Sequence, residues 1–178
     1  MKKFDLKTIV FLAMLVAISI ICGKYLAIRG GDIMRFSLEN MPIIFAGIAF
    51  GPLAGGLVGA VADLVGCIMV GYTINPIVTI GATVIGVIAG VLPLLMKKTK
   101  LSSTIILIIT VTAAHTVGSV IVKTVGLASY YEMPFIILLL WRILNYVIVG
   151  SIDGIALHAL FSRKEIRTHV KMLGGREI

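Results

Sequence analysis

The sequence predicts an all-α integral membrane protein, a single membrane domain over residues 1–178 with six transmembrane helices and both termini in the cytoplasm. Of its 178 residues, 59% are hydrophobic and only 13% are charged, whereas soluble domains are about half apolar and about a quarter charged. So few charges cannot cover a water-facing surface. The apolar runs at 105–109 and 135–141 lack the polar alternation of a transmembrane β-strand. Helices are therefore expected to carry the fold.

The basic residues predict which side of the membrane the termini occupy. The formal net charge is +8, from 16 Lys and Arg against 8 Asp and Glu, and in a soluble protein this excess would indicate nucleic acid. Here 11 of the 16 lie in three clusters beside apolar runs, the positive-inside pattern of membrane proteins. We therefore expect a lipid bilayer around this chain, and no nucleic acid as a partner. The clusters are Lys2/Lys3/Lys7, Lys97/Lys98/Lys100 and Arg163/Lys164/Arg167/Lys171/Arg176.

The expected helices follow the apolar runs in order, and six of them bring all three clusters to the cytoplasm. The first, over 8–27, is interpreted as a retained helix because no small-residue cleavage site leads into a polar domain. A polar outer loop over 29–40 leads into a second helix over 41–50, which ends at the turn dipeptide Gly51-Pro52. The remaining helices are expected over 53–70, 77–96, 103–125 and 135–161.

Four glycines stand four residues apart around that turn, at Gly47, Gly51, Gly55 and Gly59. Such small-xxx-small series let helix backbones approach closely in membranes. We therefore expect the second and third helices to be tightly packed. A functional hinge at the turn is the alternative.

Five basic residues oppose the positive-inside trend, because the expected topology puts them on the outer side or in the outer half of the membrane. A cavity that is open to the outside and accepts an anionic molecule would explain this placement. For Lys24, snorkelling of a long side chain to the interface is the preferred explanation. The five residues are Lys24, Arg29, Arg35, Lys123 and Arg142.

Two charged residues lie deep in the expected helices. Arg142 and Asp63 are each about 12 Å from the outer end at about 1.5 Å per residue, where an unpaired charge costs several kcal/mol. One interpretation is an Asp63–Arg142 ion pair that locks the bundle. The other is that both line a polar ligand pocket together with Asn145 and Tyr146. The two interpretations are compatible.

Other polar residues also have two interpretations. His115 is expected to hydrogen-bond across helices, with a proton relay as the alternative, and Asp153 either bonds a neighbouring helix or contacts a ligand. Glu39 and Asn40 could bind a ligand or simply cap the second helix, since oxygen side chains satisfy the free amides of a helix start. Asn75 has the same ambiguity at the fourth helix.

Signatures of catalysis are missing from the sequence. It contains no Gly-rich phosphate loop ending in Lys-Ser or Lys-Thr, no His-Glu-x-x-His or paired-cysteine metal motif, and no serine in a nucleophile elbow. We therefore predict neither a catalytic residue nor a metal site, and no enzymatic activity. An energised transporter built on this chain would need its ATPase in another subunit.

The stretch from Arg35 to Gly66 resembles the substrate-binding S component of energy-coupling factor (ECF) vitamin transporters, and most of all the folate family. The specific part is Ala46-Gly-x-x-Phe-Gly-Pro-x-x-Gly55, followed by Val61-Ala-Asp-Leu. The resemblance implies a six-helix S-component bundle in a prokaryotic cell membrane. In that family an Ala-x-x-x-Ala motif of the first helix docks on a transmembrane coupling protein, and Ala13-Met-Leu-Val-Ala17 matches it.

The resemblance also implies partners and a mechanism. The coupling protein and two ATPase subunits would supply the energy, so that ATP is used by the partners and no cofactor is bound directly by this chain. The S component would bind its vitamin on the outer side, topple in the membrane and release it inside.

Folate suits the polar residues on chemical grounds. Its pterin edge can be held by a carboxylate or an amide, its two tail carboxylates by Arg or Lys, and its rings by aromatic side chains. Riboflavin, thiamine or a queuosine precursor on the same scaffold is the alternative, although cationic thiamine fits poorly with outer basic residues. A small membrane enzyme using Asp63, His115 and Asp153 is disfavoured by their different depths. The candidates are Asp63, Glu39 and Asn75 for the pterin, Arg35, Arg29, Lys123 and Arg142 for the tail, and Tyr72, Tyr146 and Trp141 for the rings.

Overall fold

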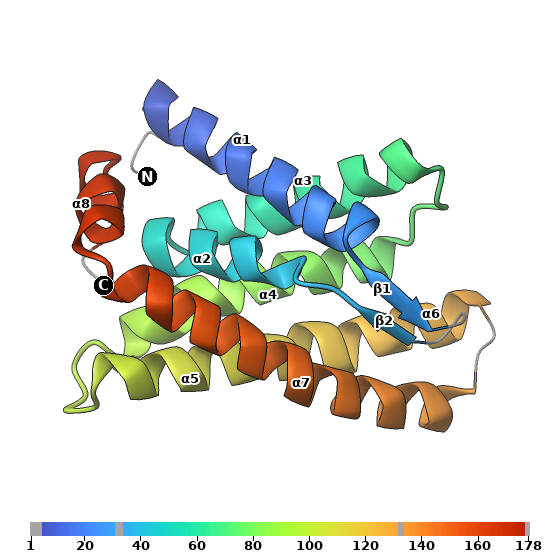
Figure 1. Ribbon diagram of the computed structural model, residues 1–178. Helices are drawn as coiled ribbons and strands as arrows, with labels where there is room; N and C mark the ends of the chain where they lie inside the picture. The colour runs from blue at the N-terminus through green and yellow to red at the C-terminus, as the bar shows by residue number, and fades with distance from the viewer. Residues whose placement is uncertain (1–4, 31–33, 132–133, 177–178) are drawn as a thin grey trace.

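The computed structural model describes residues 5–30, 34–131 and 134–176, and all structural statements refer to these residues. They form a bundle of helices with one small hairpin (Figure 1). The elements are α1 (Leu6–Ile20), η1 (Ile21–Tyr25), β1 (Ile28–Gly30), β2 (Met34–Phe36), α2 (Asn40–Phe50), α3 (Pro52–Val70), α4 (Pro76–Met96), α5 (Ser103–Ala114), η2 (His115–Val122), α6 (Lys123–Tyr131), α7 (Phe135–Ser162) and α8 (Lys164–Met172).

Five helical segments of the described chain are long and apolar enough to cross a membrane, namely 6–25, 52–70, 76–96, 103–130 and 135–162. The second expected helix is present as α2, but its 11 residues span only about 16 Å, against about 30 Å of hydrocarbon. The chain returns across the bundle through β2 and α2 together (Figure 1). Both ends of the chain consequently lie at the same end of the bundle.

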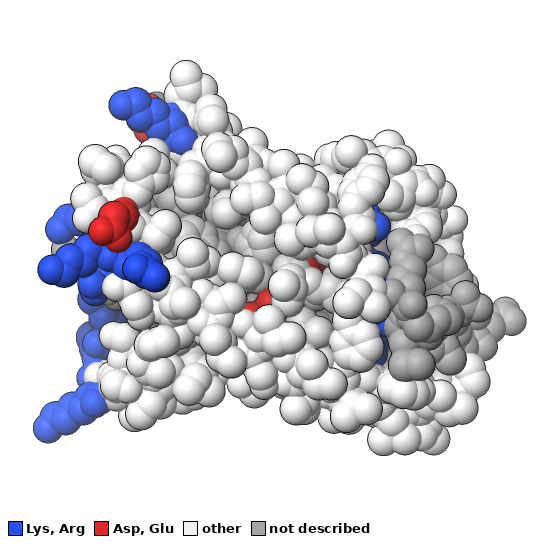
Figure 2. All heavy atoms as spheres, viewed as in Figure 1, with Lys and Arg blue, Asp and Glu red and all other residues white. Residues whose placement is uncertain are grey.

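The basic side chains gather at that end, over α8 and the α4–α5 connection (Figure 2). We call it the basic end, and the opposite end, which carries β1, β2 and α6, the strand end. The described members of the three predicted clusters therefore share one side, as expected from their sequence pattern, whereas Lys2 and Lys3 lie outside the described residues. The residues concerned are Lys7 in the first turn of α1, Lys97, Lys98 and Lys100 in the α4–α5 connection, and Arg163, Lys164, Arg167, Lys171 and Arg176 in or beside α8.

Glycines set the contact between α2, α3 and α4. A Cβ on Gly55 would meet the carbonyl oxygen of Gly86 and the backbone of Gly47, and a Cβ on Gly86 would meet the backbone of Gly55. The expected close packing is confirmed. Gly51 has a second reason to be glycine, because its φ of +104° is a conformation that a side chain disfavours.

The apolar core lies toward the basic end, between α2 and its neighbours. Ile44, Ala46 and Ile85 are fully buried or nearly so, and the rings of Phe45 and Phe161 stack at 4.9 Å between centroids. Most of the other large apolar side chains of α1, α5 and α7 face outward, as in a helix bathed in lipid. The charged residues of the candidate binding site lie on the other side of this core, toward the strand end.

Three local features were not expected from the sequence. Strands β1 and β2 pair antiparallel inside the predicted outer loop, with Arg29 opposite Arg35. Two π-helical segments interrupt the first and fifth helices. The basic tail forms α8, which is held against α1 by a 2.6 Å hydrogen bond from the Thr8 hydroxyl to the Leu173 carbonyl and by buried Val170.

Candidate binding site

Glu39 is the centre of an ion-pair network at the strand end. One of its oxygens, Oε2, lies 2.8 Å from Arg35 Nη2, and the other, Oε1, lies 3.0 Å from Lys123 Nζ. Glu39 immediately precedes α2, Arg35 belongs to β2, and Lys123 lies 84 residues away along the chain. One carboxylate therefore ties the hairpin and α2 to α6.

The charges of this network keep Glu39 ionised. Burial by itself would raise the pKa of Glu39, but Lys123 and Arg35 outweigh it and hold that pKa well below its ordinary value. The same carboxylate raises the pKa of Arg35, and Asp63, Tyr72 and Tyr146 lie close enough to add to the effect. The structure thus brings six of the predicted site residues into one electrostatic neighbourhood.

A small cavity lies beside this network. Its volume is about 10 Å³, and its walls include Lys24 of η1, Asp63 of α3, Lys123 of α6 and Glu39, which precedes α2. Asp63 accepts a 2.7 Å hydrogen bond from the Thr79 hydroxyl across the α3–α4 contact. This volume is about what a single water molecule needs.

A second group of polar residues lies on α7. Arg142 donates a 2.7 Å hydrogen bond to the carbonyl oxygen of Ser119, and its guanidinium carbon lies 5.9 Å from the centroid of the Tyr146 ring. Asn145 donates a 2.7 Å hydrogen bond to the Arg35 carbonyl. Arg35 therefore joins the α7 group to the ion-pair network.

The Asp63–Arg142 ion pair, one of the two interpretations of these residues, is not among the ion pairs of the described chain. Asp63 bonds to Thr79 and Arg142 to Ser119, because α3 and α7 present these side chains to different neighbours. The capping interpretation of Glu39 is also wrong, since its side chain makes no cap hydrogen bond to α2 and is engaged by the two cations instead.

Asn75 caps α4, as one of its two interpretations predicted. Its Oδ1 accepts from the backbone amide of Ile77 at 3.0 Å, and its Nδ2 donates to the Gly126 carbonyl at 2.8 Å. Both ends of the amide are thus engaged in joining α4 to α6, and Asn75 does not line the small cavity.

The expected cross-helix hydrogen bond of His115 is confirmed. His115 Nε2 lies 3.0 Å from Asp153 Oδ2, and both side chains are buried. The His115 ring also lies 5.1 Å from the Tyr146 ring. Because Asp63 is engaged with Thr79 on other helices, the structure does not assemble the three residues of the alternative enzyme site.

Sequence reasoning missed Lys24 as a site residue. Its ammonium does not turn away toward the interface; it lies 3.6 Å from the Cys67 sulfur and 5.7 Å from the centroid of the Tyr72 ring, at the wall of the cavity. The sequence signal that could have identified Lys24 is that it is one of the five basic residues that oppose the positive-inside trend. Of the other ring and tail candidates, Trp141 is half-buried, and the side chain of Arg29 lies outside the described residues.

Fold and site together define a small polytopic membrane protein with a cluster of charged residues near one end of its bundle. The chain matches the family model described as "ECF transporter, substrate-specific component" over residues 7–161, which is most of its length. The chain therefore belongs to this family of ECF transporter components.

One curated relative and several solved structures are similar to the chain. "Folate transporter FolT" of Clostridium novyi (strain NT) is 30% identical over 94 residues, 49% of this chain and 52% of the relative. The alignment thus spans about half the length of that relative.

Two solved structures share the fold more widely. "Crystal structure of FolT bound with folic acid" has a TM-score of 0.70 at 24% identity and covers 88% of this chain and 93% of that one. The structure of an S component for biotin has a TM-score of 0.67 at 19% identity, covering 88% and 92% of the two chains. These two likenesses establish the fold.

Proposed function

We propose that this chain is the vitamin-binding S component of an ECF importer and captures folate from the outer side of a prokaryotic cell membrane. The observation that supports folate as the ligand is the charge of the strand-end site. Four cations surround two carboxylates there, which gives a formal net charge of +2. The cations are Lys24, Arg35, Lys123 and Arg142, and the carboxylates are Glu39 and Asp63.

A dianionic ligand would balance this charge. The glutamate tail of folate carries two carboxylates, for which Arg35, Lys123 and Arg142 are donors of matching chemistry. Glu39 now engages two of these cations, so the ligand's carboxylates would compete with it. Asp63, which also lines the small cavity, can accept from the N–H groups of the pterin edge, and Tyr146 and Tyr72 offer rings for stacking.

The site has to widen before it takes such a ligand. Pockets for ligands of this size have about 300–1,000 Å³, against about 10 Å³ for the cavity among the described residues. The hairpin that carries Arg35 is joined to the helices here by polar contacts, the Glu39 pair and the Asn145 bond. We propose that these contacts rearrange on binding.

The partners proposed for the chain are a transmembrane coupling protein and two ATPase subunits, which use the ATP. Ala13 and Ala17 lie exposed on α1, beside exposed Val10, Met14 and Ile18. Small side chains within an apolar strip allow a partner helix to approach closely. The basic end would face the cytoplasm by the positive-inside rule.

The docking proposal is tested by adding bulk to this strip. Ala13→Leu and Ala17→Leu are expected to leave vitamin binding intact and to abolish co-purification with the coupling protein and ATPases. Ile155→Phe, on an exposed face of α7, is the control that adds comparable bulk elsewhere. Full assembly of the doubly substituted chain would rule out this docking surface.

The ligand is tested by titrating the detergent-purified chain with folate, 5-formyltetrahydrofolate, riboflavin and thiamine. Binding is followed by the fluorescence of the single tryptophan, Trp141, and by calorimetry. Saturable folate binding that weakens in Arg35→Ala is expected. Tight binding of riboflavin or another vitamin without folate binding would discard the ligand and keep the transport class, whereas binding of none would discard both.

A further inference from the structure

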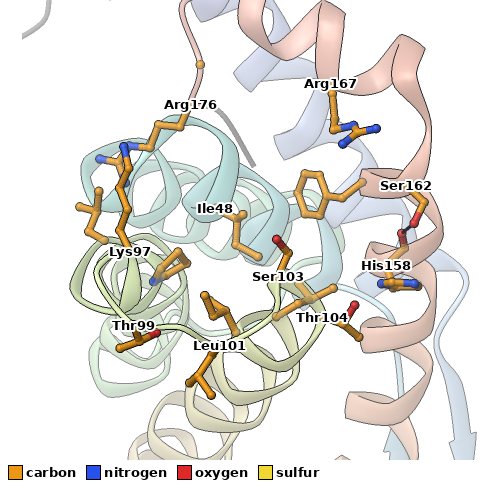
Figure 3. A pocket seen from close by; sticks show the side chains of 16 residues that line it. Ile48, Lys97, Thr99, Leu101, Ser103, Thr104, His158, Ser162, Arg167 and Arg176 are labelled. Carbon is orange, nitrogen blue, oxygen red and sulfur yellow. Dashed lines mark hydrogen bonds between the residues drawn. The ribbon is translucent and has the colours of Figure 1, made fainter.

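A larger cavity lies at the basic end, on the opposite side of the apolar core from the charged site. Its volume is about 910 Å³, and it lies between the α4–α5 connection, α7, α8 and the end of the described chain. Figure 3 shows Lys97 and Arg176 on one side of it, with Arg167 and His158 on the other. Vitamin binding, as proposed above, leaves this cavity without a role.

The charges at this cavity all have one sign. Lys97, Arg167 and Arg176 line it, and among its described lining residues none is acidic. Arg176 is partly engaged, since it donates a 3.0 Å hydrogen bond to the Gly90 carbonyl. Lys97 and Arg167 are exposed and belong to none of the ion pairs of the described chain. Two exposed cations thus line a cavity that has no carboxylate among its described lining residues.

The remaining walls combine hydroxyl groups with an apolar floor. Ser103, Thr104 and Ser162 add hydroxyls that can donate to an anion, while Ile48, Leu107 and Phe161 form apolar walls. A small soluble anion would leave the apolar walls without a partner, and an uncharged acyl chain would leave the cations without one. The cavity therefore matches a molecule with a negative headgroup and an apolar tail.

The lipid leaflet beside the cavity contains molecules with a negative headgroup and an apolar tail. Leu94 and Leu101 line it and are exposed, and Leu94 lies in the last turns of a helix long enough to span the bilayer. The cavity thus adjoins the headgroup region of the leaflet at the basic end. Basic pockets between transmembrane helices are known to hold anionic lipid headgroups.

We propose that this cavity binds one anionic phospholipid of the adjoining leaflet, with its phosphate between Lys97 and Arg167 and one acyl chain against Ile48 and Phe161. The site is separate from the strand-end site and does not depend on which vitamin the chain binds. Its occupant would fix the α4–α5 connection to α7 and α8.

The proposal is tested with the full chain purified in detergent, by native mass spectrometry during titration with phosphatidylglycerol or with phosphatidylcholine of the same acyl chains. A single phosphatidylglycerol adduct is expected, with much weaker phosphatidylcholine binding. Lys97→Gln/Arg167→Gln is expected to weaken the phosphatidylglycerol adduct roughly thirtyfold, because each cation near an anionic headgroup contributes about five- to sixfold.

The matched control is Lys98→Gln/Lys164→Gln, which removes the same charge from the basic end at residues that do not line the cavity; it is expected to bind as the unsubstituted chain does. Thr104→Trp keeps every charge and places an indole in the cavity lining, and is expected to weaken the adduct by obstructing the lipid while remaining monodisperse with an unchanged melting temperature. Glycerol 3-phosphate, a headgroup without a tail, is expected to compete only weakly. Equal loss in both double variants, unchanged binding in Thr104→Trp, or competition by glycerol 3-phosphate as strong as that of the lipid would overturn the proposal.

Discussion

The two cavities at opposite ends of the bundle differ in size and in how their charges are satisfied. At the strand end a cavity of about 10 Å³ is closed around cations that Glu39 already pairs. At the basic end a cavity of about 910 Å³ has cations without carboxylate partners among its lining residues. The difference teaches that cavity volume and buried charge point to different ends of this bundle. Buried and mutually paired charges persist in lipid only when structure or function requires them, and the proposed vitamin site rests on them.

The largest expected effect comes from removing the central carboxylate. Glu39→Gln leaves Lys123, which is 3% exposed, without its ionic partner, so we expect the free energy of unfolding to fall by about 3–5 kcal/mol. Thermal unfolding in detergent measures it. The control is Glu165→Gln at the exposed start of α8, where a change within about 0.5 kcal/mol is expected. Equal effects of the two substitutions would mean that the strand-end pairs are no stronger than surface pairs.

The two ends should also differ in their effect on the vitamin. Arg35→Ala is expected to weaken folate binding by about 2 kcal/mol, or roughly thirtyfold, since it removes a partly buried cation of the proposed site. Lys97→Gln/Arg167→Gln removes two cations of the basic end and should change folate affinity by less than about twofold. Calorimetry on both purified variants makes the comparison. A large loss in the basic-end variant would break the division of roles between the cavities.

A smaller effect is expected in the glycine contact that separates the two ends. Gly86→Ala puts a methyl group onto the backbone of Gly55, and we expect a loss of about 1–3 kcal/mol in unfolding free energy. In Gly154→Ala the new methyl group meets nothing within 4 Å, so the better helix propensity of alanine should stabilise the chain by up to about 1 kcal/mol. Melting temperatures that shift in the same direction in both variants would contradict the close packing.

The smallest effect near neutral pH is that of pH itself. Because the pKa of Glu39 is lowered in the folded chain, its contribution to stability is complete above the unfolded-state pKa of about 4.3 and is lost as the pH falls through the folded value. The stability difference between the unsubstituted chain and Glu39→Gln should therefore stay constant from about pH 8 to about pH 5.5 and shrink only below about pH 4. Melting curves of both chains across this range measure the difference. A difference that grew on acidification would mean that folding raises the pKa of Glu39 and does not lower it.

Much of the fold could be predicted because its signals are local. The apolar runs placed the third, fourth and sixth helices to within about a residue at either end, and the four-residue glycine spacing predicted the close α2–α3 contact. The close approach of both helices to α4 at Gly86 was not predicted. The π-helical segments and the hairpin had no such signal. A π turn differs from an α turn by one residue in its hydrogen bonding, and hydrophobic periodicity does not resolve that difference.

Most residues of the candidate site could be predicted, but their pairing could not. Arg35 and Lys123 were identified because they oppose the positive-inside trend, Asp63 because a charge deep in an apolar helix is costly, and Glu39 because a carboxylate can hold a pterin edge. That Asp63 bonds to Thr79, and not to Arg142, depends on how the helices rotate about their axes. The inward path of Lys24 depends on the same rotation.

The sequence by itself determined that the chain lies in a membrane, that its described basic clusters share one end and that its second and third helices pack through glycine. Composition and spacing suffice for these, because the free energy of placing apolar and charged groups relative to lipid is set residue by residue. Only the tertiary structure decided that the Glu39 carboxylate joins Arg35 to Lys123, which lies 84 residues after Glu39 in the chain. It also decided that the larger of the two cavities lies at the basic end. Contacts between distant segments depend on helix packing, which the close approach of backbones at Gly55 and Gly86 fixes.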